Sequence, residues 1–532
     1  MIKYFLIVIL LSIHIANAQH IPSSFYLKGE AKLYKILSEN PSGNSISDII
    51  TIGDTVWIGS SKGVSLSTDK GVSWQNFYGN PAFGTESISA IGYDHGFFWA
   101  ATAHSTDING TSFDEGSGLK YTTNSGLTWN SIPQPVDNNA DSLVTYGINT
   151  LRALPVTVKV QNLIYDIAFT PGTIWIASFA GGLRKSTNIG TSWQRVVIPP
   201  DYLDSIKPTD TLDFCLQPVA GNFCSENNLN YRVFSVISVN DTTLYVGTAG
   251  GINKSTDGGI SWTKFTHLNQ DNPITGNFVV AMAFDTVKNN VWAATWQADG
   301  STESNGVSST SDGGKSWNTF LAGEKVHNFG FKSGDVIALS DDGAFRSSNL
   351  GINWILPNSI YDDQTKITLT TSIFYAAASI VNSTMDTNEV WLGSDDGLAK
   401  LSEIPGEMWQ GKWKIFRSSP SLTTSTQTYA YPNPFSPKQN ILKIKYSTGG
   451  KSSSVTIKIF DFGMNYLRTI INNATRGQYS HVVDNFNLQT NGVEDTWDGR
   501  DANGNIVPNG VYFYRIEFDS GNPVFGKILV LQ

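Results

Sequence analysis

The 532-residue chain has almost no cysteine and little charge. Its net charge of -9 leaves no basic patch or stripe for nucleic acid, so we expect no nucleic-acid partner. Beyond its N-terminus the chain has no apolar run of the roughly 20 residues that a membrane-spanning helix needs, so we expect no transmembrane segment in the mature chain. The residues that are abundant, 49 Gly and 15 Trp among many Ser and Thr, favour β structure.

The N-terminus predicts a secretory signal peptide over residues 1–18. Lys3 supplies a positive charge, Phe5 to Leu11 form an apolar stretch, and Ala16-Asn17-Ala18 gives the small-residue cleavage pattern. The alternative is a membrane anchor, but Ser12 and His14 interrupt the apolar run too early for a spanning helix. We therefore expect cleavage after Ala18 and export through the inner membrane.

The two cysteines, Cys215 and Cys224, lie nine positions apart. In an oxidising compartment such a pair closes a loop, so we expect a disulfide. A redox or metal pair would instead show the short C-x-x-C spacing and a nearby His. We expect neither a metal nor a cofactor.

One unit recurs along most of the chain. Its core, here called the box, is Ser/Thr-x-Asp/Asn-x-Gly-x-Ser/Thr-Trp, and its six copies are identified by their acidic or amide residue: Asp69, Asn124, Asn188, Asp257, Asp312 and Asn349. The first five boxes follow an aromatic strand-like run, such as Val56–Gly59, whereas the sixth copy is weaker and has Asn353 in place of Ser or Thr. In all six copies a glycine precedes the box Trp at a fixed distance. A fixed hairpin between variable loops is typical of a structural repeat.

The residues of the box predict a structural role. Asp or Asn in a tight turn accepts backbone N–H groups of following residues, and Gly supplies a positive φ. The Trp packs its ring between layers. Because three of the six copies carry Asn, the charge is dispensable, and we do not expect these side chains to bind calcium or to catalyse.

A seventh, degenerate unit follows the six boxes. Val390–Gly393 matches the upstream strand, but Glu403–Trp409 replaces the box. Ala31–Leu37 also has strand character, and could either complete the last blade or stand as an extra edge strand. Because closing into a ring protects sheet edges, the sequence predicts an all-β, seven-bladed β-propeller over residues 25–417, with six or eight blades as alternatives.

The box resembles the Asp-box (BNR) repeat of sialidases, sortilin-type receptors, xyloglucan hydrolases and photosystem II assembly-factor propellers. The resemblance covers roughly residues 25–417 and implies a fold rather than an activity. A sialidase of this type would need an arginine triad and an Arg-Ile-Pro motif. The nearest string to that motif is Tyr514–Glu517, in the C-terminal region, so a sialidase activity is not expected.

A polar linker over residues 418–428 separates a C-terminal region with a different pattern. Alternating runs such as Leu442–Tyr446, with turn signals between them, predict a small antiparallel sandwich over residues 429–532. Asp501, Asn503 and Asn505 could suggest calcium, but the other ligands of a calcium loop are missing, which favours a hairpin turn.

The motifs Tyr431-Pro-Asn-Pro-Phe435, Trp497–Asn505 and Pro508–Ile516 resemble the C-terminal sorting domain of type IX secretion cargo in Bacteroidota. They also resemble the Ig-like domain of the flagellar hook-capping protein. The resemblance implies that the domain binds the secretion machinery and can be cleaved off on export. It further implies that the product is secreted or attached to the outer cell surface.

Ligand-binding groups of propellers usually gather on the face opposite the boxes, in the loops that follow the aromatic strand. By that rule the candidates are Asp114, Glu115, Trp296, Asp341, Asp395 and Asp396, with His104, Asp107, Asp299, Glu303 and Asp342 beside them. Each could equally be a solvated turn residue. No pattern orders these acids into the acid and base of a glycosidase. We therefore name no catalytic residue and expect a non-catalytic propeller that binds an extracellular protein or glycan, with a glycoside hydrolase as the alternative.

Overall fold

The computed structural model describes residues 37–297, 302–365, 367–382, 387–418, 422, 428–448, 452–477 and 493–532. Within these ranges the regular structure is β, apart from one 3-10 turn at Leu229–Tyr231. No helix in the described part of the chain could cross a membrane. The predicted signal peptide, residues 31–36 of the predicted edge strand and Asp299 lie outside the described residues.

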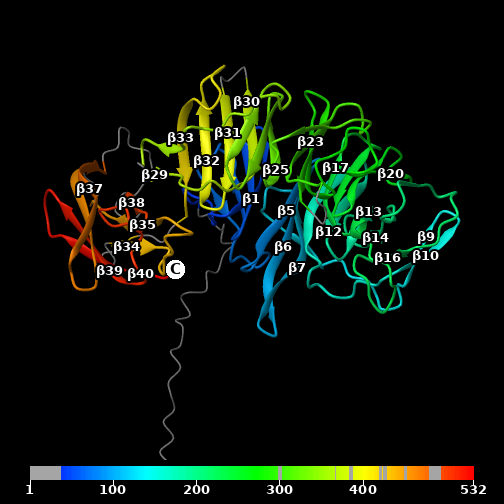
Figure 1. Cartoon of the computed structure of the whole chain (residues 1–532), viewed down its shortest axis with the longest axis horizontal. Helices are drawn as coiled ribbons and strands as arrows, with labels where there is room; N and C mark the ends of the chain where they lie inside the picture. The colour runs from blue at the N-terminus through cyan, green and yellow to red at the C-terminus, as the bar shows by residue number, and fades with distance from the viewer. Residues whose placement is uncertain are drawn as a thin grey trace, which may run out of the picture. The chain divides into compact units, whose positions relative to one another are not determined.

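In the described ranges, seven antiparallel sheets follow one another along the chain (Figure 1). The first three are β1 (Ile46–Ile52), β2 (Thr55–Ser60), β3 (Gly63–Ser67) and β4 (Gln75–Asn76); β5 (Ser87–Asp94), β6 (Phe97–Ile108), β7 (Thr111–Thr122) and β8 (Asn130–Ile132); and β11 (Ile164–Thr170), β12 (Thr173–Ser178), β13 (Gly182–Ser186) and β14 (Gln194–Arg195). The fourth is β17 (Val233–Ser238), β18 (Leu244–Thr248), β19 (Gly251–Ser255) and β20 (Trp262–Phe265), with β15 (Ser205–Ile206) on its outer edge.

The remaining three sheets follow the same order. They are β21 (Phe278–Asp285), β22 (Asn290–Trp296), β23 (Gly306–Thr310) and β24 (Asn318–Phe320); β25 (Val326–Lys332), β26 (Asp335–Ser340) and β27 (Ala344–Ser347); and β30 (Phe374–Asn382), β31 (Thr387–Ser394), β32 (Gly397–Glu403) and β33 (Gly411–Phe416). A small hairpin, β28 (Tyr361–Asp362) and β29 (Ile367–Thr368), precedes the last sheet.

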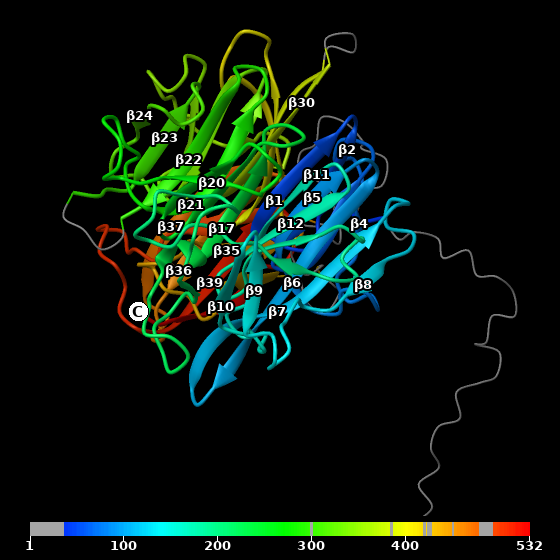
Figure 2. The same ribbon diagram turned by 90° about the vertical axis from the view of Figure 1, so that its right-hand side faces the viewer.

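The first strands of the seven sheets line a common axis. In the order β1, β5, β11, β17, β21, β25, β30, each contacts the next, and β30 contacts β1, so the ring closes (Figure 2). The chain is therefore a β-propeller. Each sheet is built from one continuous stretch of chain, and no described strand is exchanged between the first and last sheets. Ser38 instead pairs with Trp74 on the outer edge of the first sheet.

The box turns have one hydrogen-bonding pattern at one end of the ring. In the first copy the Ser67 hydroxyl donates to Asp69 at 2.7 Å, and Asp69 accepts the backbone N–H and the hydroxyl of Ser73 at 2.9 and 2.5 Å. In the second copy the direction of one bond reverses, because the Asn124 amide donates to the Thr128 hydroxyl at 2.9 Å. The geometry is kept without the charge, which explains why Asp and Asn alternate among the copies.

The box also joins neighbouring sheets. Gly71 has φ 79°, and a Cβ placed there would lie 2.6 Å from the Trp391 ring of the seventh sheet. Trp74 is fully buried and lies edge-on to Trp391 and Phe416, with ring centroids 6.2 and 5.6 Å away. The box therefore has glycine because the turn lies against a large apolar side chain of the preceding sheet, and the core lies between successive sheets.

The degenerate seventh unit has an ion-pair cluster in place of a box. Glu403 is buried, accepts a hydrogen bond from Arg346 at 2.6 Å and pairs with Lys332, both from the sixth sheet. It also accepts the backbone N–H of Trp409 at 2.7 Å. These charged hydrogen bonds hold the pKa of Glu403 below its usual range despite its burial. A buried carboxylate thus links two sheets where the other repeats use a turn.

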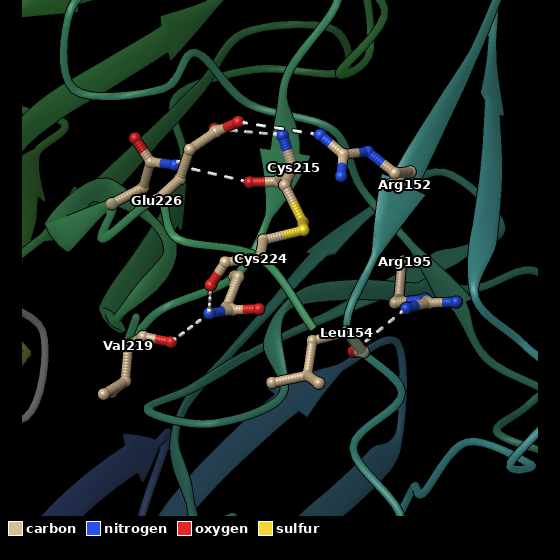
Figure 3. Close-up of a disulfide and its surroundings, with 9 residues drawn as sticks. Arg152, Leu154, Arg195, Cys215, Val219, Cys224 and Glu226 are labelled. Carbon is tan, nitrogen blue, oxygen red and sulfur yellow. Dashed lines mark hydrogen bonds and ion pairs between the residues drawn. A yellow bond between two sulfur atoms is a disulfide. The ribbon is translucent and has the colours of Figure 1, made fainter. Parts of the chain in front are cut away.

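Two long insertions flank the third sheet and pair with each other. β10 (Asn149–Ala153) lies between β9 (Leu143–Tyr146) and, in parallel, β16 (Cys215–Leu216). Cys215 and Cys224 form a disulfide, and the Glu226 carboxylate accepts the backbone N–H of Cys215 at 3.1 Å (Figure 3). Asp137 of the first insertion accepts two hydrogen bonds from Arg184 of β13, at 2.7 and 3.0 Å. The insertions are thereby fixed to the sheet.

The C-terminal region forms two sheets around its own core. One contains β34 (Thr428–Tyr431), β35 (Leu442–Tyr446) and β38 (Val493–Trp497), and the other contains β37 (Tyr466–Arg476), β36 (Ser453–Phe460), β39 (Gly510–Phe518) and β40 (Val524–Val530). The inward side chains, among them Trp497, Tyr446 and Tyr514, are fully buried. Asp501 accepts the backbone N–H groups of Asn503 and Asn505 at 2.9 Å each, so this segment is a side-chain-capped turn.

Candidate functional site

A channel of about 850 Å³ runs along the axis of the ring. Its wall includes one residue at the same position of each first strand. Near the start of each of these strands a β-bulge leaves this residue without a partner on the second strand. In ring order these residues are Ser47, Ser89, Tyr165, Phe234, Val280, His327 and Tyr375. A bulge redirects a side chain out of the sheet surface, and here it turns seven side chains into the channel.

The channel has two chemically different ends. The first strands start at the mouth and run toward the box end, where their hairpins to the second strands lie beside the box turns, as the backbone bond from Gly258 to Thr242 shows. The mouth is therefore opposite the boxes, where the sequence placed its candidate residues. The long β6–β7 hairpin projects beyond the neighbouring strands on this side (Figure 1).

Six aromatic rings form a continuous arc around the mouth, contributed by five consecutive sheets. We call this set the arc; its members, in order, are Tyr165, Phe234, Phe278, Trp296, His327 and Tyr375. Successive ring centroids lie 5.3, 4.9, 6.0, 5.5 and 5.0 Å apart, mostly edge to face. All six rings are partly exposed. On the side of the first two sheets the equivalent channel positions are serines, Ser47 and Ser89.

Carboxylates lie beside both ends of the arc. At one end Asp341 lies 2.7 Å from Nε2 of His327, and Asp341 and Asp395 add to the burial that raises the pKa of Tyr375. At the other end burial, and then Asp114, raise the pKa of Tyr165. A carboxylate therefore acts on the outermost ring at each end of the arc.

A further acid pair lies near Asp341. Partial burial, together with Asp342 and Asp341, raises the pKa of Glu324, and the Glu324 and Asp342 side chains share a hydrogen bond. Partial burial, opposed by a hydrogen bond from Thr371, also raises the pKa of Asp395. Acids with raised pKa values beside ionised neighbours are a feature of functional clefts as well as of crowded surfaces.

Deeper in the channel, Asp48 and Asp166 connect neighbouring sheets. Asp48 accepts the backbone N–H of Ile49 at 2.8 Å and that of Ile91 in the second sheet. Asp166 accepts the hydroxyl of Ser235 and the N–H of Val236 in the fourth sheet, at 2.8 and 2.9 Å. Desolvation raises the pKa of Asp48 to about 7 and also raises that of Asp166. Their acceptor capacity is used by the backbone, so we assign them to the fold.

The structure brings only part of the predicted set to the arc. Trp296 is a member, its indole N–H donating to the Val326 carbonyl at 2.9 Å, and Asp341 and Asp395 lie beside it. Asp396 is engaged elsewhere, because its carboxylate pairs with Arg417 at 2.7 Å and with Lys443 of β35.

The other predicted residues have local partners. Glu115 and His104 lie on the β6–β7 hairpin, with 3.8 Å between the carboxylate and Nε2, and Asp114 accepts the Ser105 hydroxyl at 3.3 Å. Asp107 accepts the N–H of Gly110 at the hairpin tip. Glu303 accepts the Asn277 amide at 2.7 Å. Of this group, Asp114 acts on a ring of the arc, because its charge adds to the burial that raises the pKa of Tyr165.

Sequence reasoning missed five of the six arc residues. Tyr165, Phe234, His327 and Tyr375 all immediately precede the small or polar residue at the bulge: Asp166, Ser235, Asn328 and Ala376. That shared position is visible in the sequence, where an aromatic residue stands near the start of four of the seven inner strands. Only the bulge, however, turns it toward the channel instead of into the sheet. Among the described residues, no group of three or more His, Cys, Asp or Glu side chains could hold a metal ion.

No family model and no curated protein matches the chain. Among solved structures, an ancestral GH74 enzyme is 16% identical to this chain, with a TM-score of 0.49. The match covers 90% of this chain and 61% of the GH74 chain. YCF48 from Cyanidioschyzon merolae is 13% identical with a TM-score of 0.40, covering 64% of this chain and 88% of its own.

PorZ, a bacterial surface component of the type IX secretion system of Porphyromonas gingivalis, is 13% identical with a TM-score of 0.32. The match covers 92% of this chain and 66% of that chain. This chain thus spans less than two thirds of the length of PorZ and of the GH74 enzyme.

Proposed function

We propose that this chain is an exported, non-catalytic Asp-box propeller that binds an extracellular protein or glycan at the mouth of its channel. The arc is the observation that carries the proposal. Four of the six rings, Tyr165, Phe234, His327 and Tyr375, line the channel. Together with their ring neighbours Phe278 and Trp296 they leave partly exposed apolar surface, which a ligand would cover. The seven sheets in ring order support seven blades.

The proposal includes delivery by the C-terminal region. Its two small sheets and its motifs support an Ig-like sorting domain that engages a type IX-like secretion machinery, following a signal peptide over residues 1–18. A chain lacking residues 429–532 should then cross the inner membrane and remain in the periplasm of the producing bacterium. Its appearance at the cell surface or in the medium would contradict this assignment.

Binding is tested with the purified full chain on an array of extracellular proteins and polysaccharides. The double variant Phe234→Ala, Tyr375→Ala should lose the ligand that the parent retains. The matched control is Phe462→Ala, because Phe462 is an exposed ring of the C-terminal region. Retention by the double variant would place the binding surface away from the arc.

A glycoside hydrolase is the second candidate, and one observation favours it. Glu324 has a raised pKa beside Asp341 and Asp342 at the channel mouth, which is how an acid and a base are differentiated in such enzymes. The non-catalytic proposal predicts that no new reducing ends form when polysaccharides are incubated with the chain. Turnover that disappears in Glu324→Gln, Asp395→Asn or Asp396→Asn would establish the hydrolase instead.

A further inference from the structure

The arc is bordered by more negative than positive charge. Asp114 acts on Tyr165 at one end, and Asp341 and Asp395 act on Tyr375 at the other. Asp396 adds little to this balance because Arg417 and Lys443 neutralise it. The mouth therefore combines exposed ring faces with carboxylates, of which Asp341 has the His327 ring 2.7 Å away and Asp395 is partly balanced by Lys443.

One cation of the chain lies over a ring of the arc, and a second lies over a ring next to the arc. The Lys325 ammonium lies 6.0 Å from the centroid of the Trp296 ring, and the Arg232 guanidinium lies 5.4 Å from that of Phe179, a neighbour of Phe234. An ammonium or guanidinium group is attracted to the face of an aromatic ring by its quadrupole. The rings at the two ends, Tyr165 and Tyr375, have carboxylates beside them instead.

We infer that the mouth binds a positively charged segment of a partner protein, with Lys or Arg side chains received between the arc and its flanking carboxylates. The inference rests on the proposed function and selects the protein class over the glycan class. Charge complementarity carries the choice, because a neutral glycan would make ring contacts and hydrogen bonds to the carboxylates but would not gain the charge–charge attraction that a Lys or Arg side chain gains. The arc spans five consecutive sheets, which fits an extended segment better than a single small cation.

The probe is a fluorescein-labelled peptide of alternating Gly and Lys, with matched peptides in which Gln or Glu replaces Lys. Fluorescence polarisation with the full chain should show binding of the Lys peptide alone, and binding should weaken as salt rises because screening reduces the attraction. Equal binding of the Gln peptide would overturn the inference.

Charge variants locate the binding. The double variant Asp341→Asn, Asp395→Asn should weaken Lys-peptide binding about tenfold, which corresponds to about 1.4 kcal/mol. The control Asp241→Asn, Asp257→Asn makes the same change in net charge at the box end. An equal loss in the control would mean attraction by the net charge of the molecule, and it would overturn the inference. Thermal unfolding confirms that each variant is folded.

Ring variants separate this inference from the proposed function. Phe234→Ala, Tyr375→Ala should weaken Lys-peptide binding, while the remaining affinity stays sensitive to salt. If a neutral cello-oligosaccharide binds at the rings and the Lys peptide does not, the arc is a binding site for the other class of ligand, and only the present inference fails. If neither binds and no array member depends on the rings, both proposals fail.

Discussion

The two ends of the propeller are built from the same repeats but use their residues in opposite ways. At the box end the polar atoms are satisfied within the turn, as in Asp257, which accepts the backbone N–H and the hydroxyl of Ser261 at 2.8 and 2.5 Å. At the mouth the equivalent positions change from sheet to sheet, from Ser47 to Tyr375, and their rings stay partly exposed. The residues of the box end are the same from repeat to repeat because they hold the ring together, whereas the residues at the mouth differ from sheet to sheet, where we propose that a ligand binds.

The largest expected difference between the ends concerns tryptophan. Trp262→Ala should lower the free energy of unfolding by about 3–5 kcal/mol, because the ring is buried and its removal leaves a cavity. Trp296→Ala, at the mouth, should cost less than half of that, because its ring is partly exposed. Urea unfolding of the full chain measures both. Equal losses would show that the mouth is as important for stability as the box end.

The second prediction concerns the channel wall between the ends. Burial raises the pKa of Asp48 to about 7, so the stability linked to its proton is full below pH 3.8, the ordinary value, and is lost as the pH rises through 7. Asp48→Asn should flatten this part of the pH dependence, which amounts to at most about 4 kcal/mol. Unfolding free energies measured from pH 4 to pH 8 test it. A parallel shift of the whole profile would contradict a buried, titrating Asp48.

A smaller effect is expected for the box carboxylate. Asp257→Ala should cost about 1–2 kcal/mol, because it leaves two N–H groups without their acceptor. Asp257→Asn should stay within about 0.5 kcal/mol, because an amide can donate to the Ser261 hydroxyl as Asn124 does to Thr128. The thermal midpoints of the two variants decide this. A larger cost for Asn than for Ala would show that the charge itself matters.

The smallest effect on stability is expected at the mouth. Partial burial and the nearby Asp396 raise the pKa of Asp395, so its charge disfavours the folded state as the pH rises through the raised value. Asp395→Asn should therefore leave stability unchanged or slightly higher at neutral pH, within about 0.5 kcal/mol. A clear loss in the thermal midpoint would give Asp395 a structural role like that of Asp257, and the contrast between the ends would weaken.

Much of the fold follows from local pattern. The turn of the box depends on residues that are close in sequence. The Ser67 hydroxyl donates a hydrogen bond to Asp69 and accepts one from the Gly71 N–H, and the aromatic strand before the box is equally local. The all-β class and the propeller were predicted on these grounds and are confirmed by the structure. The separate C-terminal domain was predicted from its alternating strands and stays a prediction; the structure describes two sheets in this region.

Less of the candidate site could be predicted from the sequence, because its residues come from sheets that lie far apart in the chain. The rule of the face opposite the boxes selected Trp296, Asp341 and Asp395, which lie at or beside the arc, and also Asp396, whose charge is balanced by Arg417 and Lys443. No local pattern could show that balance, since Lys443 lies 47 residues away.

The sequence by itself determined the repeat, its turns and the tryptophans of its core, because each depends on contacts within a few residues. The ring order, the channel and the arc were decided by tertiary structure. Tyr165 and Tyr375 are separated by most of the propeller, and only closure of the ring brings β30 beside β1 and places their rings around one opening. The physical reason is that a bulge turns one side chain out of its own sheet, whereas only the packing of the seven sheets around one axis brings those side chains into the same channel.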